Sequence, residues 1–116
     1  MSYSESAPSL LFIHSPSFDR SMNGVLTDDD LRDIQDAIRA RPQSGAVIPG
    51  TSGVRKMRWG VRGSGKSGGV RVLYLVVPQH ERIYMILVYS KGQKENITET
   101  ERKQIRYLAD ALKAEA

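Results

Sequence analysis

Two apolar runs separated by a four-residue turn constrain the fold of this chain more than any other sequence feature. Apart from Arg71 and Arg82, residues 70–77 and 82–89 are apolar at successive positions, so both faces of each run are apolar, as in central strands. Residues 54–61 alternate instead between apolar and basic side chains, which predicts a half-buried strand with a basic outer face. Three consecutive strands joined by short loops indicate an antiparallel β-meander.

A first strand and flanking helices are predicted around this meander. The strand is expected at residues 9–14. A helix is predicted over residues 27–41, with its start capped by the threonine hydroxyl and its end set by Pro42. A short additional helix is expected at residues 17–22. Residues 98–101 form a capping box that opens a C-terminal helix. This order predicts an α+β fold with helices packed against one sheet.

Composition limits the classes of protein that this chain can be. Its 116 residues suffice for a single domain, residues 1–116. The absence of cysteine excludes disulfides, thiolate metal sites and cysteine nucleophiles, and fits a reducing cytoplasm. His14 and His80 are interpreted as structural or solvent-facing, so we expect no metal and no cofactor. With no signal peptide and no apolar stretch near the ~20 residues that span a bilayer, we expect a cytoplasmic protein without a membrane partner.

Charge is distributed unevenly along the chain. The net charge is +4, but residues 37–80 contain eight bases and no acid. Such a block cannot neutralise its own field, so we expect it to bind phosphates or an acidic partner chain. A solvated basic face is the alternative interpretation. Six of its cations are concentrated in one short segment: Arg55, Lys56, Arg58, Arg62, Lys66 and Arg71.

Residues 60–67 match the nucleotide-binding pattern G-x-x-x-x-G-K-[ST]. That loop requires a helix beginning at its Lys-Ser pair, because the N–H groups of the helix hold the phosphates. Here Gly68 and Gly69 follow, and then a strand. No candidate strand ends in an Asp that could hold magnesium. We therefore interpret the match as a basic hairpin loop and do not predict an NTPase.

Arg, Lys and Tyr are the residue types left for catalysis. They can cleave RNA, because positioned cations stabilise the charge that develops when a 2′-hydroxyl attacks the adjacent phosphorus. A Lys or Tyr can move protons in this reaction, and a surrounding cluster of cations is expected to lower its pKa. Trp59, in phase with Met57, is interpreted as a core residue, whereas Tyr89 fits a core cap and an active-site phenol equally well.

Three blocks of sequence carry a resemblance to a known family. They are residues 50–59 (GTSGVRKMRW), 65–74 (GKSGGVRVLY) and 89–98 (YSKGQKENIT). In this order they resemble the HigB-type branch of the RelE/ParE toxin superfamily, and the expected element order agrees over nearly the whole chain. The resemblance implies the toxin of a bacterial type II toxin–antitoxin pair, a metal-independent endoribonuclease that cuts messenger RNA on the ribosome. It also implies a cognate antitoxin, expected to be a helix-turn-helix protein.

The resemblance further implies roles for individual residues. The implied catalytic residues are Lys56, Arg58, Arg71, Tyr89 and Lys91, and the implied RNA-binding residues are Arg55, Arg62, Lys66 and Lys94. Asn96 stands where the family commonly has Asp, which we interpret as a capping variation. His80 does not match the catalytic histidines of some relatives, so the general acid and base stay unassigned.

Several alternatives remain open from the sequence. Arg55 shares the strand phase of Met57 and Trp59, so a structural role fits it as well as catalysis. Arg71 shares its phase with Leu73, which places it either on the concave face of the sheet or merely at a strand end. The alternative functions are a gyrase-directed toxin of the same superfamily, without nuclease activity, and a non-catalytic RNA-binding module.

Overall fold

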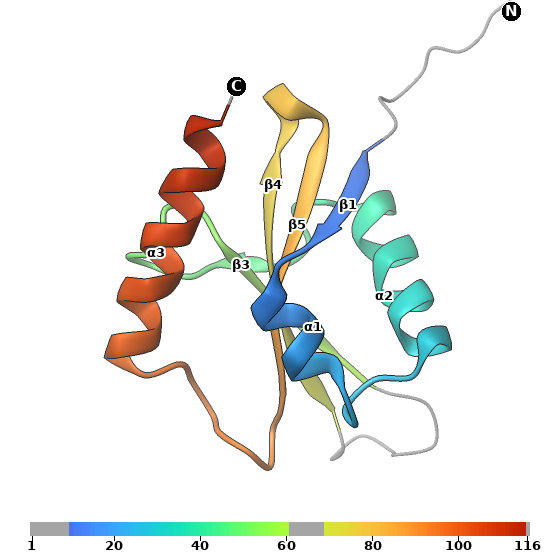
Figure 1. Ribbon diagram of the computed structural model, residues 1–116. Coiled ribbons are helices and arrows are strands. Elements are labelled where there is room, and N and C mark those ends of the chain that lie inside the picture. The colour runs from blue at the N-terminus through green and yellow to red at the C-terminus, as the bar shows by residue number, and fades with distance from the viewer. Residues whose placement is uncertain (1–9, 61–68, 116) are drawn as a thin grey trace, which may run out of the picture.

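The computed structural model describes residues 10–60 and 69–115, which build a five-stranded sheet between helices (Figure 1). The strands are β1 (Leu11–His14), β2 (Ala46–Val47), β3 (Arg55–Trp59), β4 (Val70–Val77) and β5 (Arg82–Ser90), in the spatial order β1-β5-β4-β3-β2. β1 pairs parallel with β5, and all other pairs are antiparallel. The α+β class and the antiparallel meander are thus confirmed.

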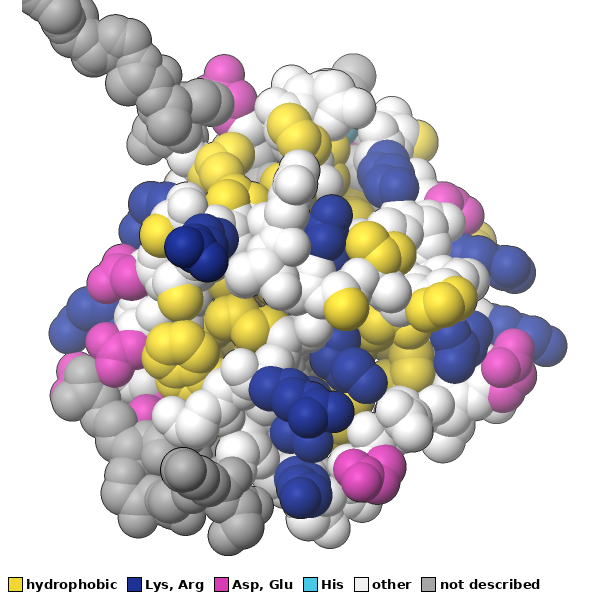
Figure 2. Space-filling view, turned by 180° about the vertical axis from the view of Figure 1, so that it is seen from behind, with side chains coloured by type: hydrophobic (Ala, Val, Ile, Leu, Met, Phe, Trp, Pro, Cys, Tyr) yellow, Lys and Arg dark blue, Asp and Glu magenta, His cyan; other side chains and the backbone are white. Residues whose placement is uncertain are grey.

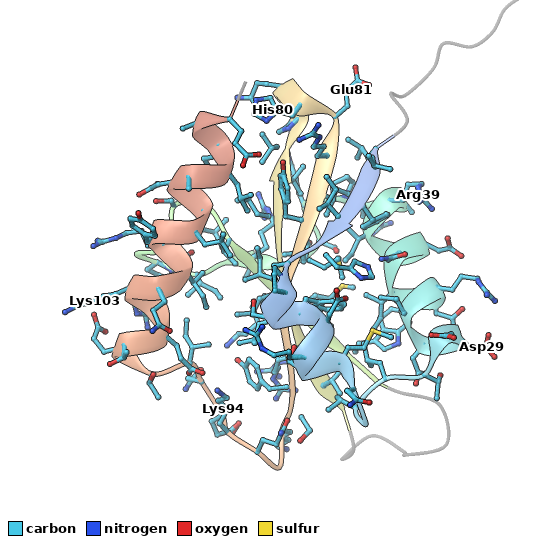
Figure 3. The ribbon with its side chains drawn as sticks, viewed as in Figure 1. Asp29, Arg39, His80, Glu81, Lys94 and Lys103 are labelled. Carbon is cyan, nitrogen blue, oxygen red and sulfur yellow. The ribbon has the colours of Figure 1, made fainter. Side chains whose placement is uncertain are left out.

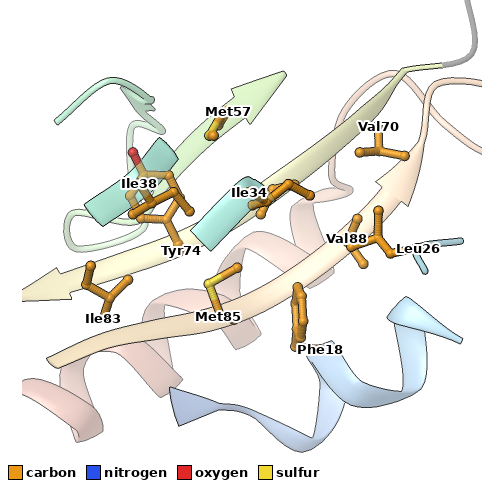
Figure 4. Close-up of a cluster of buried hydrophobic side chains, with 11 residues drawn as sticks. Phe18, Leu26, Ile34, Ile38, Met57, Val70, Tyr74, Ile83, Met85 and Val88 are labelled. Carbon is orange, nitrogen blue, oxygen red and sulfur yellow. The ribbon is translucent and has the colours of Figure 1, made fainter. Parts of the chain in front are cut away.

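Helices cover both faces of the sheet, as strands that are apolar on both faces require. They are α1 (Pro16–Met22), α2 (Asp28–Ala40) and α3 (Glu99–Ala114). Side chains of α1, α2 and one sheet face form a buried cluster around Phe18, Ile34 and Tyr74 (Figure 4). A second cluster, which includes Leu75 and Ile105, joins the other sheet face to α3. Below, these are the α1/α2 face and the α3 face of the sheet.

Both long helices begin where the sequence predicts. Thr27 and Thr98 are N-caps, and each hydroxyl accepts a hydrogen bond of 3.1 Å from the backbone N–H of the third helical residue. Those third residues are Asp30 and Glu101, whose carboxylates accept a bond from the cap backbone in return. The predicted short helix at residues 17–22 is confirmed as α1.

Strand β5 carries a β-bulge. The register between β4 and β5 shifts between Leu73 and Tyr74, which leaves Ile86 as one extra residue on β5. Its carbonyl oxygen accepts hydrogen bonds from Ser15 Oγ (3.0 Å) and Ser17 Oγ (2.7 Å) at the start of α1. Serine hydroxyls at the start of α1 therefore satisfy the Ile86 carbonyl of β5, just beyond the end of β1.

Strand β2 is a feature that the sequence does not predict. Its two residues are exposed and show no alternation, so only their pairing with β3 defines them. The loop before β2 is fixed by the Tyr74 hydroxyl, which accepts from Gly45 N–H (2.9 Å) and donates to Pro42 O (2.9 Å). A Cβ at Gly45 would lie 2.9 Å from that hydroxyl, so the close approach requires glycine.

Other predictions can be placed on this fold. Trp59 is half-buried against the α1/α2 cluster, which confirms it as a core residue. His14 contacts Asp19 Oδ1 through Nδ1 and Gln35 Nε2 through Nε2, each at 3.0 Å, so its role is structural. His80 lies in the 3-10 turn η2 (Pro78–His80), and its buried Nδ1 has no partner among the described residues. Strand β4 begins at Val70, so a strand follows the glycine-rich loop, as expected; residues 61–68 of that loop lie outside the described residues.

Residues 10–60 and 69–115 contain neither a membrane-spanning helix nor a metal-binding cluster. No helix there is both long enough and apolar enough to cross a bilayer. No group of three His, Asp or Glu side chains in that part of the chain could hold a metal ion.

Candidate active site

A row of polar side chains crosses three strands on the α3 face. Lys56 and Arg58 alternate with Met57, which is buried on the opposite face. The register places Arg58 beside Arg71 of β4, and Arg71 beside Tyr89 of β5. Side chains directly opposite each other in neighbouring strands have Cβ atoms about 4.5–5.5 Å apart. The sheet therefore brings together four residues that the sequence spreads over 34 positions.

The loop between β5 and α3 adds a further cation, Lys94 (Figure 3). Lys94 Nζ lies 5.3 Å from the centre of the Tyr89 ring and 2.5 Å from Glu101 Oε2. Glu101 Oε1 accepts from the backbone N–H of Thr98 (2.8 Å), so the capping box of α3 also orients Lys94 over the phenol. On the other side, Lys56 Nζ donates to Asn96 Oδ1 (3.3 Å). We call the following five residues the cationic site: Lys56, Arg58, Arg71, Tyr89 and Lys94.

Arg71 and Tyr89 are buried, with 8% and 3% of their surface exposed. Among the described residues, no carboxylate pairs with the Arg71 guanidinium. The Tyr89 hydroxyl likewise has no hydrogen-bond partner within residues 10–60 and 69–115. Buried polar groups are nearly always partnered, so an unpartnered cation beside an unpartnered hydroxyl is a site prepared for an anion.

The pKa of Tyr89 lies above its ordinary value. Burial raises it most, the Arg71 guanidinium lowers it, and the carboxylates of Glu101 and Glu95 raise it again. The expectation that neighbouring cations would lower this pKa is therefore wrong, because the loss of hydration outweighs the attraction to Arg71. At neutral pH the phenol is protonated and can donate its proton.

The Glu101 carboxyl is shifted in the other direction. Burial raises its pKa, but the hydrogen bonds from Lys94 and Thr98 more than reverse this effect, so its pKa is below the ordinary value. Glu101 is therefore ionised at neutral pH and pairs with the Lys94 ammonium. From the sequence Glu101 does not stand out as a site residue, because its position in the capping box already explains a glutamate there.

The remaining predicted site residues lie elsewhere. Arg55 lies on the α1/α2 face, where its guanidinium donates to Gly45 O (2.7 Å) and Gln43 O (3.3 Å). The structure thus separates Arg55 from the cationic site and gives it the structural contact that its strand phase indicates. Lys91 follows β5 directly and is exposed. Arg62 and Lys66 lie outside the described residues.

The surface reflects the uneven charge of the sequence. Figure 2 shows the molecule from behind, with a group of Lys and Arg side chains gathered below the centre and apolar side chains beside them. Arg58, the most exposed arm of the row, is accessible to solvent, whereas Arg71 and Tyr89 lie beneath the surface. The site therefore has an open cationic rim and a buried floor.

The sheet, its flanking helices and this row of cations define an α+β domain with a cationic site on one face. Comparison with known protein families matches residues 14–116 to the family described as the RelE toxin of the RelE/RelB toxin–antitoxin system. The match covers most of the chain, so the protein belongs to the RelE toxin family. It is accordingly the toxin of a toxin–antitoxin system, and an antitoxin is its partner.

Proposed function

We propose that this toxin is a cytoplasmic, ribosome-dependent endoribonuclease of the HigB branch that cleaves messenger RNA at the cationic site without a metal. The observation that carries the proposal is the pairing of Arg71 and Tyr89. Within residues 10–60 and 69–115 the buried Arg71 guanidinium has no counter-ion, and it lies beside a buried, protonated phenol. This pair fits a phosphate oxygen and a leaving alkoxide better than it fits a purely structural role.

In the proposed reaction the RNA supplies its own nucleophile. The 2′-hydroxyl oxygen bonds to the adjacent phosphorus and gives up its proton to a base, and the bond from phosphorus to the 5′-oxygen breaks. The departing oxygen takes a proton and leaves as a 5′-hydroxyl, while the other product is a 2′,3′-cyclic phosphate. No oxidant, metal or other co-reactant is needed for this balance.

Each residue of the cationic site has a role in this scheme. Arg71, with Arg58 at the rim, stabilises the negative charge of the phosphorane. Tyr89 donates the proton to the 5′-oxygen, because its raised pKa keeps the phenol protonated. Lys56 and Lys91 would add positive charge around the phosphate while solvent water takes up the 2′-hydroxyl proton, and Lys94 holds the RNA backbone above the Tyr89 ring. Arg62 and Lys66 would add contacts to RNA phosphates outside the described residues.

The test uses purified protein, translating ribosomes and a defined messenger RNA in the presence of EDTA. We expect cleavage within the ribosome-bound message, with a 5′-hydroxyl and a 2′,3′-cyclic or 3′-phosphate end, and little cleavage of free RNA. Arg71→Ala should slow cleavage by roughly 100- to 1000-fold, the usual cost of one transition-state donor. Arg106→Ala is the matched control, because Arg106 is an exposed arginine of α3 outside the cationic site.

Two outcomes would reject the nuclease proposal. Intact message together with inhibited DNA gyrase would favour the gyrase-directed alternative. Binding of RNA without any cleavage would favour the non-catalytic module. Equal cleavage rates for Arg71→Ala and the wild type would reject this site even if cleavage occurs.

A further inference from the structure

A groove lies outside the cationic site, on the α1/α2 face. Its volume is about 1240 Å³, and it runs past the C-terminal end of α2, the loop after it, and strand β2. Apolar side chains contribute to its walls, among them Leu10, Val47 and Val76, and three arginines surround them, Arg39, Arg41 and Arg55. Val47 is one of the few large apolar side chains exposed among the described residues, at 49%.

The groove is far from the cationic site. Val76 and Arg71 are both on β4, five residues apart, which is roughly 16 Å at 3.3 Å per residue. They also point to opposite faces, because Val76 packs with the α1/α2 cluster while Arg71 has the parity of Leu73 on the α3 face. A molecule in the groove would therefore leave the cationic site uncovered.

The rim of the groove is positively charged and pre-organised. Among residues 10–60 and 69–115 no acidic residue lines it, in keeping with the acid-free block at residues 37–80. The Arg55 guanidinium is held by two backbone carbonyls of the neighbouring loop. The Arg39 guanidinium stacks 4.9 Å from the centre of the Phe12 ring and is paired with Asp36 one turn earlier on α2 (3.2 Å). Arg41 and Arg55 therefore supply most of the free charge of the rim. Arg41 is exposed and forms no ion pair within residues 10–60 and 69–115.

We propose that this groove is the docking site for an acidic, amphipathic segment of the antitoxin. Carboxylates of that segment would pair with the arginines, and its apolar side chains would cover Val47 and Val76. A protein segment fits better than RNA, because no aromatic ring of the described residues lines the groove to stack on a base and much of its wall is apolar. The inference rests on the toxin assignment and is independent of the nuclease chemistry proposed above.

The test compares a double variant, Arg41→Glu with Val47→Glu, with the control Arg32→Glu. All three side chains are exposed, and Arg32→Glu makes on α2, outside the groove, the same charge reversal that Arg41→Glu makes within it. The probe is the affinity-tagged product of the reading frame adjacent to the toxin gene, co-expressed with each form of the toxin. Wild type and control should co-purify with the probe. The double variant should bind it roughly 100-fold more weakly, because Arg41→Glu reverses a charge at the groove and Val47→Glu places a carboxylate in the apolar part of the interface.

Growth assays give an independent readout. The double variant should still arrest growth when expressed alone, but co-expression of the same probe should no longer rescue it.

Wild-type affinity of the probe for the double variant, or an equal loss in the control, would overturn the proposal. Retained binding with lost messenger RNA cleavage would also overturn it and make the groove an RNA surface. Groove-dependent binding by a toxin that cuts no RNA would leave the docking site standing and reject only the nuclease. A cooperative thermal transition of the double variant shows that it is folded. The milder Arg41→Ala variant tests the same contact with less risk of misfolding.

Discussion

Tyr89 illustrates how burial, more than nearby charge, sets the chemistry of a single side chain. Cations surround this phenol, and in water they would favour its ionised form. At 3% exposure the lost hydration dominates, so the phenol keeps its proton. The same burial leaves its hydroxyl without a partner among the described residues, which costs stability until a ligand arrives.

Substitution of Tyr89 by Phe separates catalysis from stability. The cleavage rate on ribosomes should fall by about 100- to 10,000-fold, the range for loss of a general acid. The melting temperature should stay the same or rise, because the removed hydroxyl is buried and unpaired. Tyr84→Phe is the matched control, since Tyr84 is buried on the same face of β5 and its hydroxyl accepts from Arg82 instead. Unchanged cleavage by Tyr89→Phe would remove the phenol from the mechanism.

At the scale of elements, the first turn of α3 connects helix capping with the cationic site. Glu101 accepts from the N-cap backbone with one oxygen and from Lys94 Nζ with the other. The helix end therefore acts as the anchor of a loop cation, and any change to this cap alters the position of Lys94 above Tyr89.

Glu101→Gln should keep the capping bond and lose the ion pair. We expect a loss of about 0.5–1 kcal/mol in the free energy of unfolding near pH 7, typical of a partly exposed pair. The folded-state pKa of Glu101 is lowered, so its contribution is present above the unfolded value of about 4.3 and disappears as pH falls through the folded value. Urea titrations of wild type and variant between pH 3 and pH 7 measure this difference.

Glu99→Gln is the control for this experiment. Glu99 lies in the same first turn and is more exposed, and its ion pair with Arg102 stays within the helix. It removes the same charge from the helix dipole but leaves Lys94 in place. Equal effects of the two substitutions on stability and on ribosomal cleavage would contradict the anchoring role of Glu101.

The sequence predicts the helices and the long strands because their signals are local. Caps, prolines and apolar spacing act within a few residues of the element they define. Local signals do not predict the bulge at Ile86, because the carbonyl of this extra residue in β5 is hydrogen-bonded by serine hydroxyls about 70 positions away. The burial of Tyr89 is equally nonlocal, whereas the separate position of Arg55 follows from strand parity that the sequence already displays.

At the scale of the whole molecule, the acid-free block should dominate binding to RNA. If the cationic site and Lys91 together neutralise about five phosphates, the logarithm of ribosome affinity should fall with the logarithm of salt with a slope of about −3 to −4. Arg58→Ala should reduce the magnitude of that slope by about one unit, because Arg58 is the exposed arginine of the cationic site. Arg106→Ala serves as the control, and a salt-independent affinity would reject the block as the docking surface.

Because β5 carries a bulge, the number of residues between Tyr84 and Tyr89, and not only their identity, decides whether the Tyr89 phenol lies beside Arg71. On a regular strand of the same length, side chains alternate strictly, and Tyr84 on the α3 face would be followed there by Val88 and not by Tyr89. Loss of a single residue between Tyr84 and Tyr89 would leave them four positions apart, so a regular strand without the bulge would still hold the phenol beside Arg71. Loss of two residues would turn the phenol away on such a regular strand. Among relatives that keep the phenol beside the guanidinium, an odd-numbered gap in this short stretch is therefore expected where β5 is regular, and an even-numbered gap, or none, where the bulge is kept.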